Sequence, residues 1–154
     1  MRGTSLAALL LTGACAVQHA TRIPCMPPSK RDEARILREE SRELGSGFRL
    51  VTRQIELLSG FEEFGYFGYL YYRDQELSEV GTYSVAPNGR SIAFQDAPTG
   101  DIVLFIAESR TCFRVRDPGA VVVEYTWDED KHELWLRRDS TEYPLGPSVR
   151  VPLP

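Results

Sequence analysis

The chain is poor in the residues that build most metal and nucleophilic sites. It has only two histidines, His19 and His132, and three cysteines, Cys15, Cys25 and Cys112. Two histidines exclude a His-rich metal centre, and a Ser/His/Asp triad would have to use His132. Cys25 has no partner in a Cys-x-x-Cys pair, which disfavours dithiol redox chemistry. We therefore predict no metal site, no cofactor and no enzymatic activity.

An excess of basic charge and a membrane-spanning segment are also missing. The chain has 18 basic and 22 acidic residues, and the two signs are interspersed. Nucleic-acid-binding domains usually carry a basic patch, so we predict no nucleic-acid partner. The N-terminal apolar run, residues 6–11, is far shorter than the ~20 residues that a helix needs to span a bilayer, and no later segment reaches that length.

Residues 1–14 are typical of an export signal. Arg2 supplies a positive charge, residues 6–11 (LAALLL) form an apolar core, and the small residues Gly13 and Ala14 come before a cleavage site. We expect this segment to be removed and the mature chain to lie outside the cytoplasm.

The end of this segment, Leu11-Thr12-Gly13-Ala14-Cys15, resembles a bacterial lipobox. In that family the chain is cut before the cysteine, whose sulfur carries the lipid. The resemblance implies lipidation of Cys15, with palmitate among the usual acyl chains, and a membrane anchor. Thr12 departs from the usual Leu. Ala16 is not the Asp that favours inner-membrane retention, which implies the periplasmic side of the outer membrane in a Gram-negative cell.

An ordinary secretory signal is the alternative. Ala14-Cys15-Ala16 also fits an A-x-A cleavage site, and the product would then be a soluble periplasmic or secreted protein. In either case Cys25 and Cys112 are left, and an oxidising compartment would allow them to pair. Such a bridge would contribute on the order of 4 kcal/mol by loop entropy. The alternative is a buried thiol at Cys112 with Cys25 exposed.

The mature chain divides by composition into three parts. Residues 15–29 contain three prolines and no apolar periodicity, which predicts a tether. Residues 30–45 are rich in helix formers and end at Gly45, which predicts one N-terminal helix. Residues 46–154 form a β-rich domain in this interpretation.

Short apolar segments separated by turn residues predict the architecture of that domain. Turn signals occur at 87–89, 97–100, 117–119 and 128–131. The segments between them have the length and residue types of β-strands. This spacing predicts a mainly β fold: an antiparallel meander that forms a single curved sheet, a small sandwich or a partial barrel.

Residues 84–94 (SVAPNGRSIAF) resemble the blade hairpin of TolB-type β-propeller repeats, followed by an apolar strand at 102–106. Pro87 presets the turn and Asn88-Gly89 supplies positive φ values. Residues 125–136 resemble a second, degenerate copy. Propellers need ~40 residues per blade and at least four blades, so the chain is too short for a closed propeller.

Three tyrosines of the strand at 65–73 are candidate binding residues: Tyr66, Tyr69 and Tyr71. Exposed tyrosines on a sheet can stack on sugar rings or contact a protein partner, and the alternative is that they belong to the core. We expect Trp127 and Trp135 to lie in the core.

Other candidate sites are less specific. His132 lies beside Glu133, but no partner for acid–base catalysis is evident. The acidic turn at 128–130 lacks the spacing of an EF-hand, and Asp96 and Asp101 flank a turn in the same manner.

These observations predict a non-catalytic cell-envelope lipoprotein that acts by protein–protein contact. Its partner would be another envelope protein or a second copy bound through a sheet edge, because exposed edges invite pairing. One alternative is a glycan- or peptidoglycan-binding module that uses the Tyr-rich face. Another is an enzyme with a site near His132.

Overall fold

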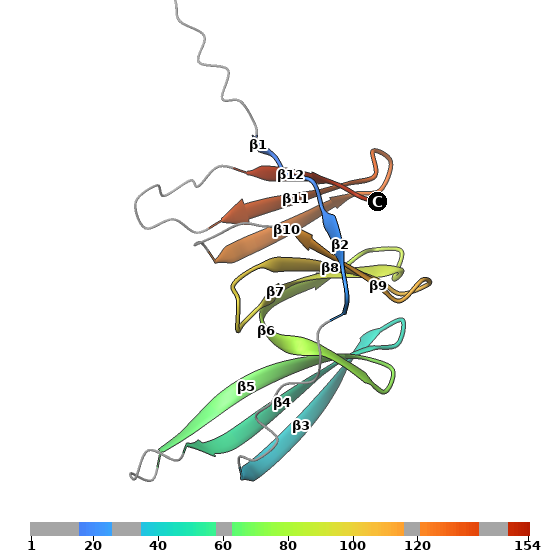
Figure 1. Ribbon diagram of the computed structural model, residues 1–154. Coiled ribbons are helices and arrows are strands. Elements are labelled where there is room, and N and C mark those ends of the chain that lie inside the picture. Colours follow the sequence, from blue (N-terminus) through green and yellow to red (C-terminus); the bar gives the residue numbers. More distant parts are fainter. Residues whose placement is uncertain (1–15, 26–34, 58–62, 116–120, 139–147) are drawn as a thin grey trace, which may run out of the picture.

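The computed structural model describes residues 16–25, 35–57, 63–115, 121–138 and 148–154, which form strands and turns (Figure 1). No helix occurs in these ranges, and so none that could cross a membrane. The strands are β1 (Ala16–Val17), β2 (Thr21–Ile23), β3 (Ile36–Gly45), β4 (Phe48–Leu57), β5 (Glu63–Tyr72), β6 (Gln75–Val85), β7 (Ser91–Asp96), β8 (Ile102–Ile106), β9 (Thr111–Val115), β10 (Val122–Asp128), β11 (Glu133–Arg138) and β12 (Val149–Pro152).

The strands form two open sheets. The larger has the order β2-β9-β8-β7-β6-β5-β4-β3, and the smaller has the order β1-β12-β11-β10. From β3 to β9 each strand pairs antiparallel with the next, whereas β1 and β12 are parallel. The prediction of a mainly β, antiparallel and unclosed structure is therefore confirmed.

The predicted helix at 30–45 is wrong over residues 36–45, which form strand β3. Gly45, expected to end a helix, instead opens a hairpin turn in which Gly45, Ser46 and Gly47 all have positive φ. Cross-strand contacts such as the 2.8 Å ion pair between Arg53 Nε and Glu39 Oε2 hold β3 on β4. Helix propensity is a weak preference, and here a sheet edge that offers backbone partners overrides it. Residues 30–34 lie outside the described part.

Strand β6 divides the larger sheet into two layers. Its first half pairs with β5 up to Val80, and its second half pairs with β7 from Val80 to Val85, with a bulge between Val80 and Tyr83. Bulges increase the local twist of a strand. The β3–β5 part consequently lies against one face of β7–β9, and the four-stranded sheet lies against the other (Figure 1).

Both faces of the middle layer are buried. On one face Ile92, Phe94 and Phe105 pack with residues of β4, β5 and β6. On the other face Ala93 and Leu104 join the apolar side of the four-stranded sheet. A strand covered on both sides needs a continuous apolar sequence, which accounts for the run at 102–106.

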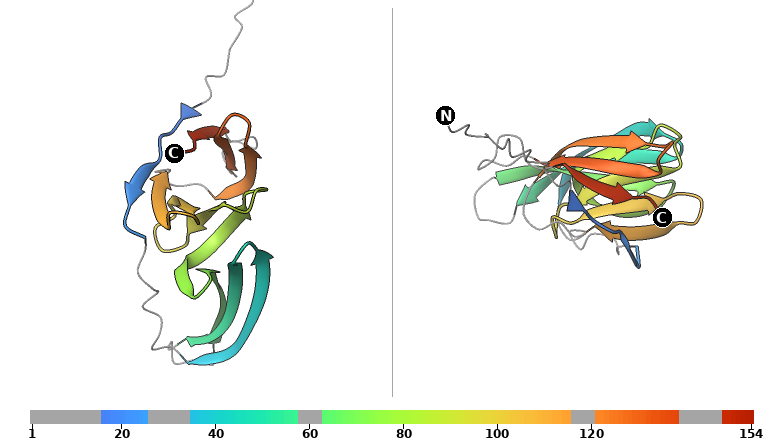
Figure 2. Two further views of the ribbon diagram at one scale, coloured as in Figure 1. Left: turned by 90° about the vertical axis from the view of Figure 1, so that its right-hand side faces the viewer. Right: turned by 90° about the horizontal axis from the view of Figure 1, so that it is seen from above.

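The N-terminal segment runs along the edges of both sheets (Figure 2). β1 extends the smaller sheet beside β12, and β2 extends the larger sheet beside β9. Residues 16–25, which belong to the segment expected to be a tether, thus lie along the domain. Residues 26–29 are outside the described part.

Candidate functional site: a groove on the four-stranded sheet

The four-stranded sheet has one apolar face and one polar face. Leu134 and Leu136 of β11 are fully buried in the core, as are Val149 and Val151 of β12. Because side chains alternate along a strand, the residues between them point away from the core. The alternation places Trp135 on this outer face.

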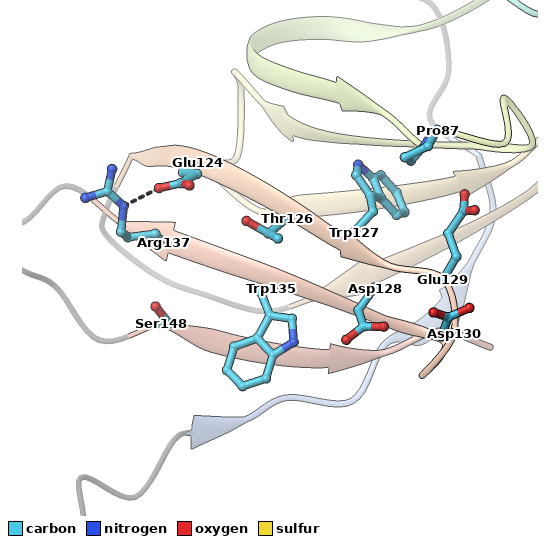
Figure 3. Close-up of a pocket in the computed structure, with 10 residues that line it drawn as sticks. All are labelled: Pro87, Glu124, Thr126, Trp127, Asp128, Glu129, Asp130, Trp135, Arg137 and Ser148. Atoms are coloured by element: carbon cyan, nitrogen blue, oxygen red, sulfur yellow. Dashed lines mark ion pairs between the residues drawn. The ribbon is translucent and has the colours of Figure 1, made fainter.

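A groove with a volume of about 660 Å³ lies over this outer face and the turn that follows β10 (Figure 3). Its lining combines aromatic, hydroxyl and charged side chains from four different segments. The lining residues are Pro87, Glu124, Thr126, Trp127, Asp128, Glu129, Asp130, Trp135, Arg137 and Ser148.

Two tryptophans supply the aromatic surface of the groove. Trp127 is half-buried against the core, and its Nε1 donates a hydrogen bond of 3.0 Å to Ser84 Oγ, which fixes the ring. Trp135 pairs across the strands with Thr126 and Arg150. Figure 3 shows Trp127 near Pro87 and Trp135 farther along the sheet, near β12. The prediction that both tryptophans belong to the core is wrong for Trp135, which is half-buried and lies on the opposite side of β11 from the core residues Leu134 and Leu136.

The charged residues of the groove are mostly acidic. Four carboxylates line it against one guanidinium, that of Arg137. Arg137 Nε lies 2.6 Å from Glu124 Oε2, so its charge is already paired. Hydrogen bonds from the side-chain and backbone nitrogens of Lys131 lower the pKa of Asp128 below its ordinary value.

A contact between two turns shapes one end of the groove. The backbone N–H of Asn88, in the β6–β7 turn, donates a hydrogen bond of 2.8 Å to Glu129 Oε1 in the β10–β11 turn. The same β6–β7 turn places Pro87 in the lining. Sequence reasoning identified both turns but gave no sign that they meet.

The three candidate tyrosines do not form a common surface. Tyr69 is 1% exposed and packs with Val51 and Ile55, and the guanidinium of Arg53 lies 4.7 Å from the centre of its ring. Tyr66 is 66% exposed. It points to the opposite face of β5, as the alternation predicts.

Tyr71 is half-buried and takes part in a polar contact with neighbouring strands. Its hydroxyl donates to Glu76 Oε2 at 2.8 Å and accepts from Arg53 Nη2 at 3.0 Å. Burial and the neighbouring Glu76 carboxylate raise the pKa of Tyr71, although Arg53 acts in the opposite direction. The side chain is thus engaged within the sheet.

The other predicted residues fall outside the groove. Cys25 and Cys112 form a disulfide whose Cα atoms are 5.1 Å apart, beside the β2–β9 pairing. Cys15 lies outside the described residues. His132 occupies an exposed turn with φ of 52°, and its carbonyl accepts a hydrogen bond from the Leu153 N–H at 2.8 Å.

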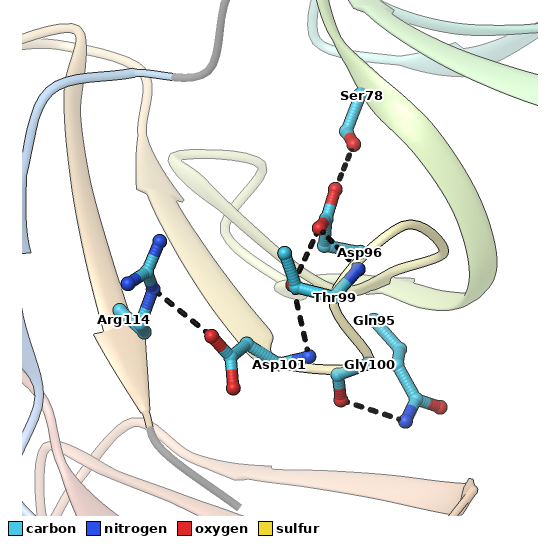
Figure 4. A network of polar contacts seen from close by, with 7 residues as sticks. All are labelled: Ser78, Gln95, Asp96, Thr99, Gly100, Asp101 and Arg114. Carbon is cyan, nitrogen blue, oxygen red and sulfur yellow. Dashed lines mark hydrogen bonds and ion pairs between the residues drawn. The ribbon is translucent and has the colours of Figure 1, made fainter. Parts of the chain in front are cut away.

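No group of three or more metal-ligating side chains occurs in the described part of the chain. Asp96 is fully buried and accepts hydrogen bonds from Ser78 Oγ and from the backbone and hydroxyl of Thr99 (Figure 4). Asp101 pairs instead with Arg114 at 3.1 Å. The two aspartates thus hold β6, the β7–β8 turn and β9 in place.

A half-buried tyrosine lies between the two sheets. Tyr125 of β10 shares a hydrogen bond of 2.8 Å with Thr82 Oγ1 of β6. Burial raises its pKa to about 12. This hydroxyl therefore stays protonated at neutral pH and acts as a structural contact behind the groove.

The chain matches no protein-family model and no curated protein. Among solved structures it is similar to a Pyrococcus horikoshii acylaminoacyl peptidase, with 12% sequence identity and a TM-score of 0.43. The similarity covers 71% of this chain and 18% of the peptidase chain. No family membership and no activity follow from a likeness of this extent.

Proposed function

We propose that the protein is a non-catalytic lipoprotein of the cell envelope that binds a partner through the groove on the four-stranded sheet. The observation that carries the proposal is the concave surface lined by Trp127 and Trp135. Tryptophan is enriched at the energetically important positions of protein interfaces, because a large ring can be buried with little loss of entropy.

One further feature supports the proposal, and two observations weaken its alternatives. The bridge between Cys25 and Cys112 suits an oxidising compartment such as the envelope. The alternative of an enzyme centred on His132 has less support, because this side chain does not line the groove. The glycan alternative loses the Tyr-rich face, since Tyr69 is covered and Tyr71 is engaged by its neighbours.

The test is to cross-link the tagged full-length protein in the cells that make it and to capture it from their envelope fraction. We expect Trp135→Ala to abolish recovery of the partner, and Tyr66→Ala, which removes an exposed aromatic outside the groove, to leave it unchanged. Intact mass of the same sample reports acylation of Cys15 and oxidation of the other two cysteines. Equal recovery of the same partner by both variants would refute the groove as the contact site, and an unacylated Cys15 would refute the lipid anchor.

A further inference from the structure

We infer that the groove binds a cationic side chain, a guanidinium or an ammonium group carried on an extended segment of a partner protein. This inference rests on the proposed function and assigns the chemistry of the ligand. It follows from three properties of the groove, namely its charge, its aromatic rings and its size.

The charge of the groove favours a cation. Of its four carboxylates, Glu124 is neutralised by Arg137 and Asp128 is paired with Lys131 at 3.0 Å. Glu129 accepts a hydrogen bond from the backbone N–H of Asn88, which brings no opposite charge to it. Glu129 and Asp130 have no ion-pair partner in the part of the chain that the structure describes. A cationic group that enters the groove would therefore meet two carboxylates that form no ion pair with another described residue.

The tryptophans favour the same ligand. A cation is attracted to the face of an aromatic ring, most strongly to that of tryptophan, and a planar guanidinium also stacks on it. Acidic side chains beside such rings strengthen this attraction. An anionic ligand such as a phosphate or a nucleic acid would be repelled. A neutral sugar could stack on Trp135 but would gain little from the unneutralised charges.

The volume of about 660 Å³ lies in the ordinary range of ligand sites. A groove of this size accommodates one long side chain with the residues around it. An extended peptide therefore fits the open surface better than a free cation does.

The experiment titrates the full-length, oxidised protein with a short unstructured peptide of Gly, Ser and several Arg residues. A second peptide with the same sequence replaces each Arg by citrulline, which has the same shape without the charge. Calorimetry and tryptophan fluorescence report binding. We expect the citrulline peptide to bind about tenfold more weakly, and the Arg peptide to weaken with rising salt.

Matched variants locate the interaction. We expect Glu129→Gln with Asp130→Asn to reduce affinity for the Arg peptide about tenfold, because both unneutralised charges are lost. Asp74→Asn with Glu108→Gln removes two exposed carboxylates from turns outside the groove and should leave affinity unchanged.

Equal binding of the Arg and citrulline peptides would overturn the inference, as would tighter binding of a neutral oligosaccharide of N-acetylglucosamine. In both cases the groove would remain a binding site of different chemistry. Failure of the proposed function is distinguishable, because partner capture would then be insensitive to Trp135→Ala.

Discussion

Asp96 places a carboxylate at a position with no exposed surface, where it contacts Ser78 on β6 and Thr99 in the β7–β8 turn. Three donors surround it, so the cost of removing this side chain from water is offset by hydrogen bonds. Its contact with Ser78 lies where β6 bends between the two layers of the larger sheet.

Replacing Asp96 by Asn should lower the free energy of unfolding by about 2 kcal/mol, because a neutral amide forms weaker hydrogen bonds and brings an extra donor into a buried site. Denaturant unfolding followed by tryptophan fluorescence measures the change. Asp101→Asn is the control: it breaks a partly exposed ion pair with Arg114 and should cost roughly 0–1 kcal/mol. A similar loss in both variants would argue against a special role for the buried carboxylate.

At this scale the sequence indicates which way a side chain points but not what covers it. Alternation correctly separates Trp135 from Leu134 and Leu136, and Tyr66 from Tyr69. Whether a face is buried depends on which layer packs against it, and that depends on contacts between residues far apart in the sequence. The groove was missed for this reason. The interspersed charges and aromatics of residues 124–137 were its only local signal.

Among the elements, β3 shows how a local preference can mislead. Its sequence, ILREESRELG, contains good helix formers, but the chain places it at the edge of the larger sheet. Its side chains are almost all exposed, so the strand does not need apolar residues at alternate positions. The charges of Arg38, Glu40 and Arg42 suit an edge, because charged side chains discourage pairing with another sheet. This bears against the idea of a homodimer formed through β3.

We predict that replacing Arg38, Glu40 and Arg42 by Thr together will promote self-association. The variant has a higher β propensity, and its edge strand lacks the charged side chains that discourage pairing with another sheet. Sedimentation velocity over a range of protein concentrations measures the effect. A control that replaces Arg90, Asp74 and Glu108 by Thr removes the same number of exposed charges from turns and should stay at the oligomeric state of the parent. Unchanged sedimentation of the β3 variant would show that its charges do not guard the edge.

Taken as a whole, the molecule is three layers held at one side by its own N-terminal segment. β1 belongs to one sheet and β2 to the other. Residues 16–23 therefore join the two sheets, which are also held together by the apolar core between them. The Cys25–Cys112 bridge fixes this segment and closes a loop with a sequence separation of 87. The strand pattern predicted the meander. It could not predict the stacking, which depends on the bend in β6 and on edge pairing by a segment with few strand-forming residues.

Replacing Cys25 and Cys112 by Ser should lower the free energy of unfolding by about 4.5 kcal/mol, the loop-entropy value for a bridge of this span. Calorimetry of the oxidised parent, the reduced parent and the double variant measures the change, and the last two should agree. Amide exchange in residues 16–25 should increase most. Equal stability of all three forms would show that strand pairing alone holds the segment.

If Cys15 carries the acyl chain proposed for it, the position of β1 limits how the protein could meet a partner. The strand begins at Ala16, the residue directly after Cys15, and Ala16 pairs with Val149, whose neighbour Ser148 lines the groove. An acyl chain on Cys15 would therefore leave no flexible spacer between the bilayer and the folded domain. The groove would be held close to the headgroups, and its reach would be only a few ångströms. Such a protein would explore only a thin layer of solvent next to the lipid headgroups. It would meet only those segments of a partner protein that lie within this layer.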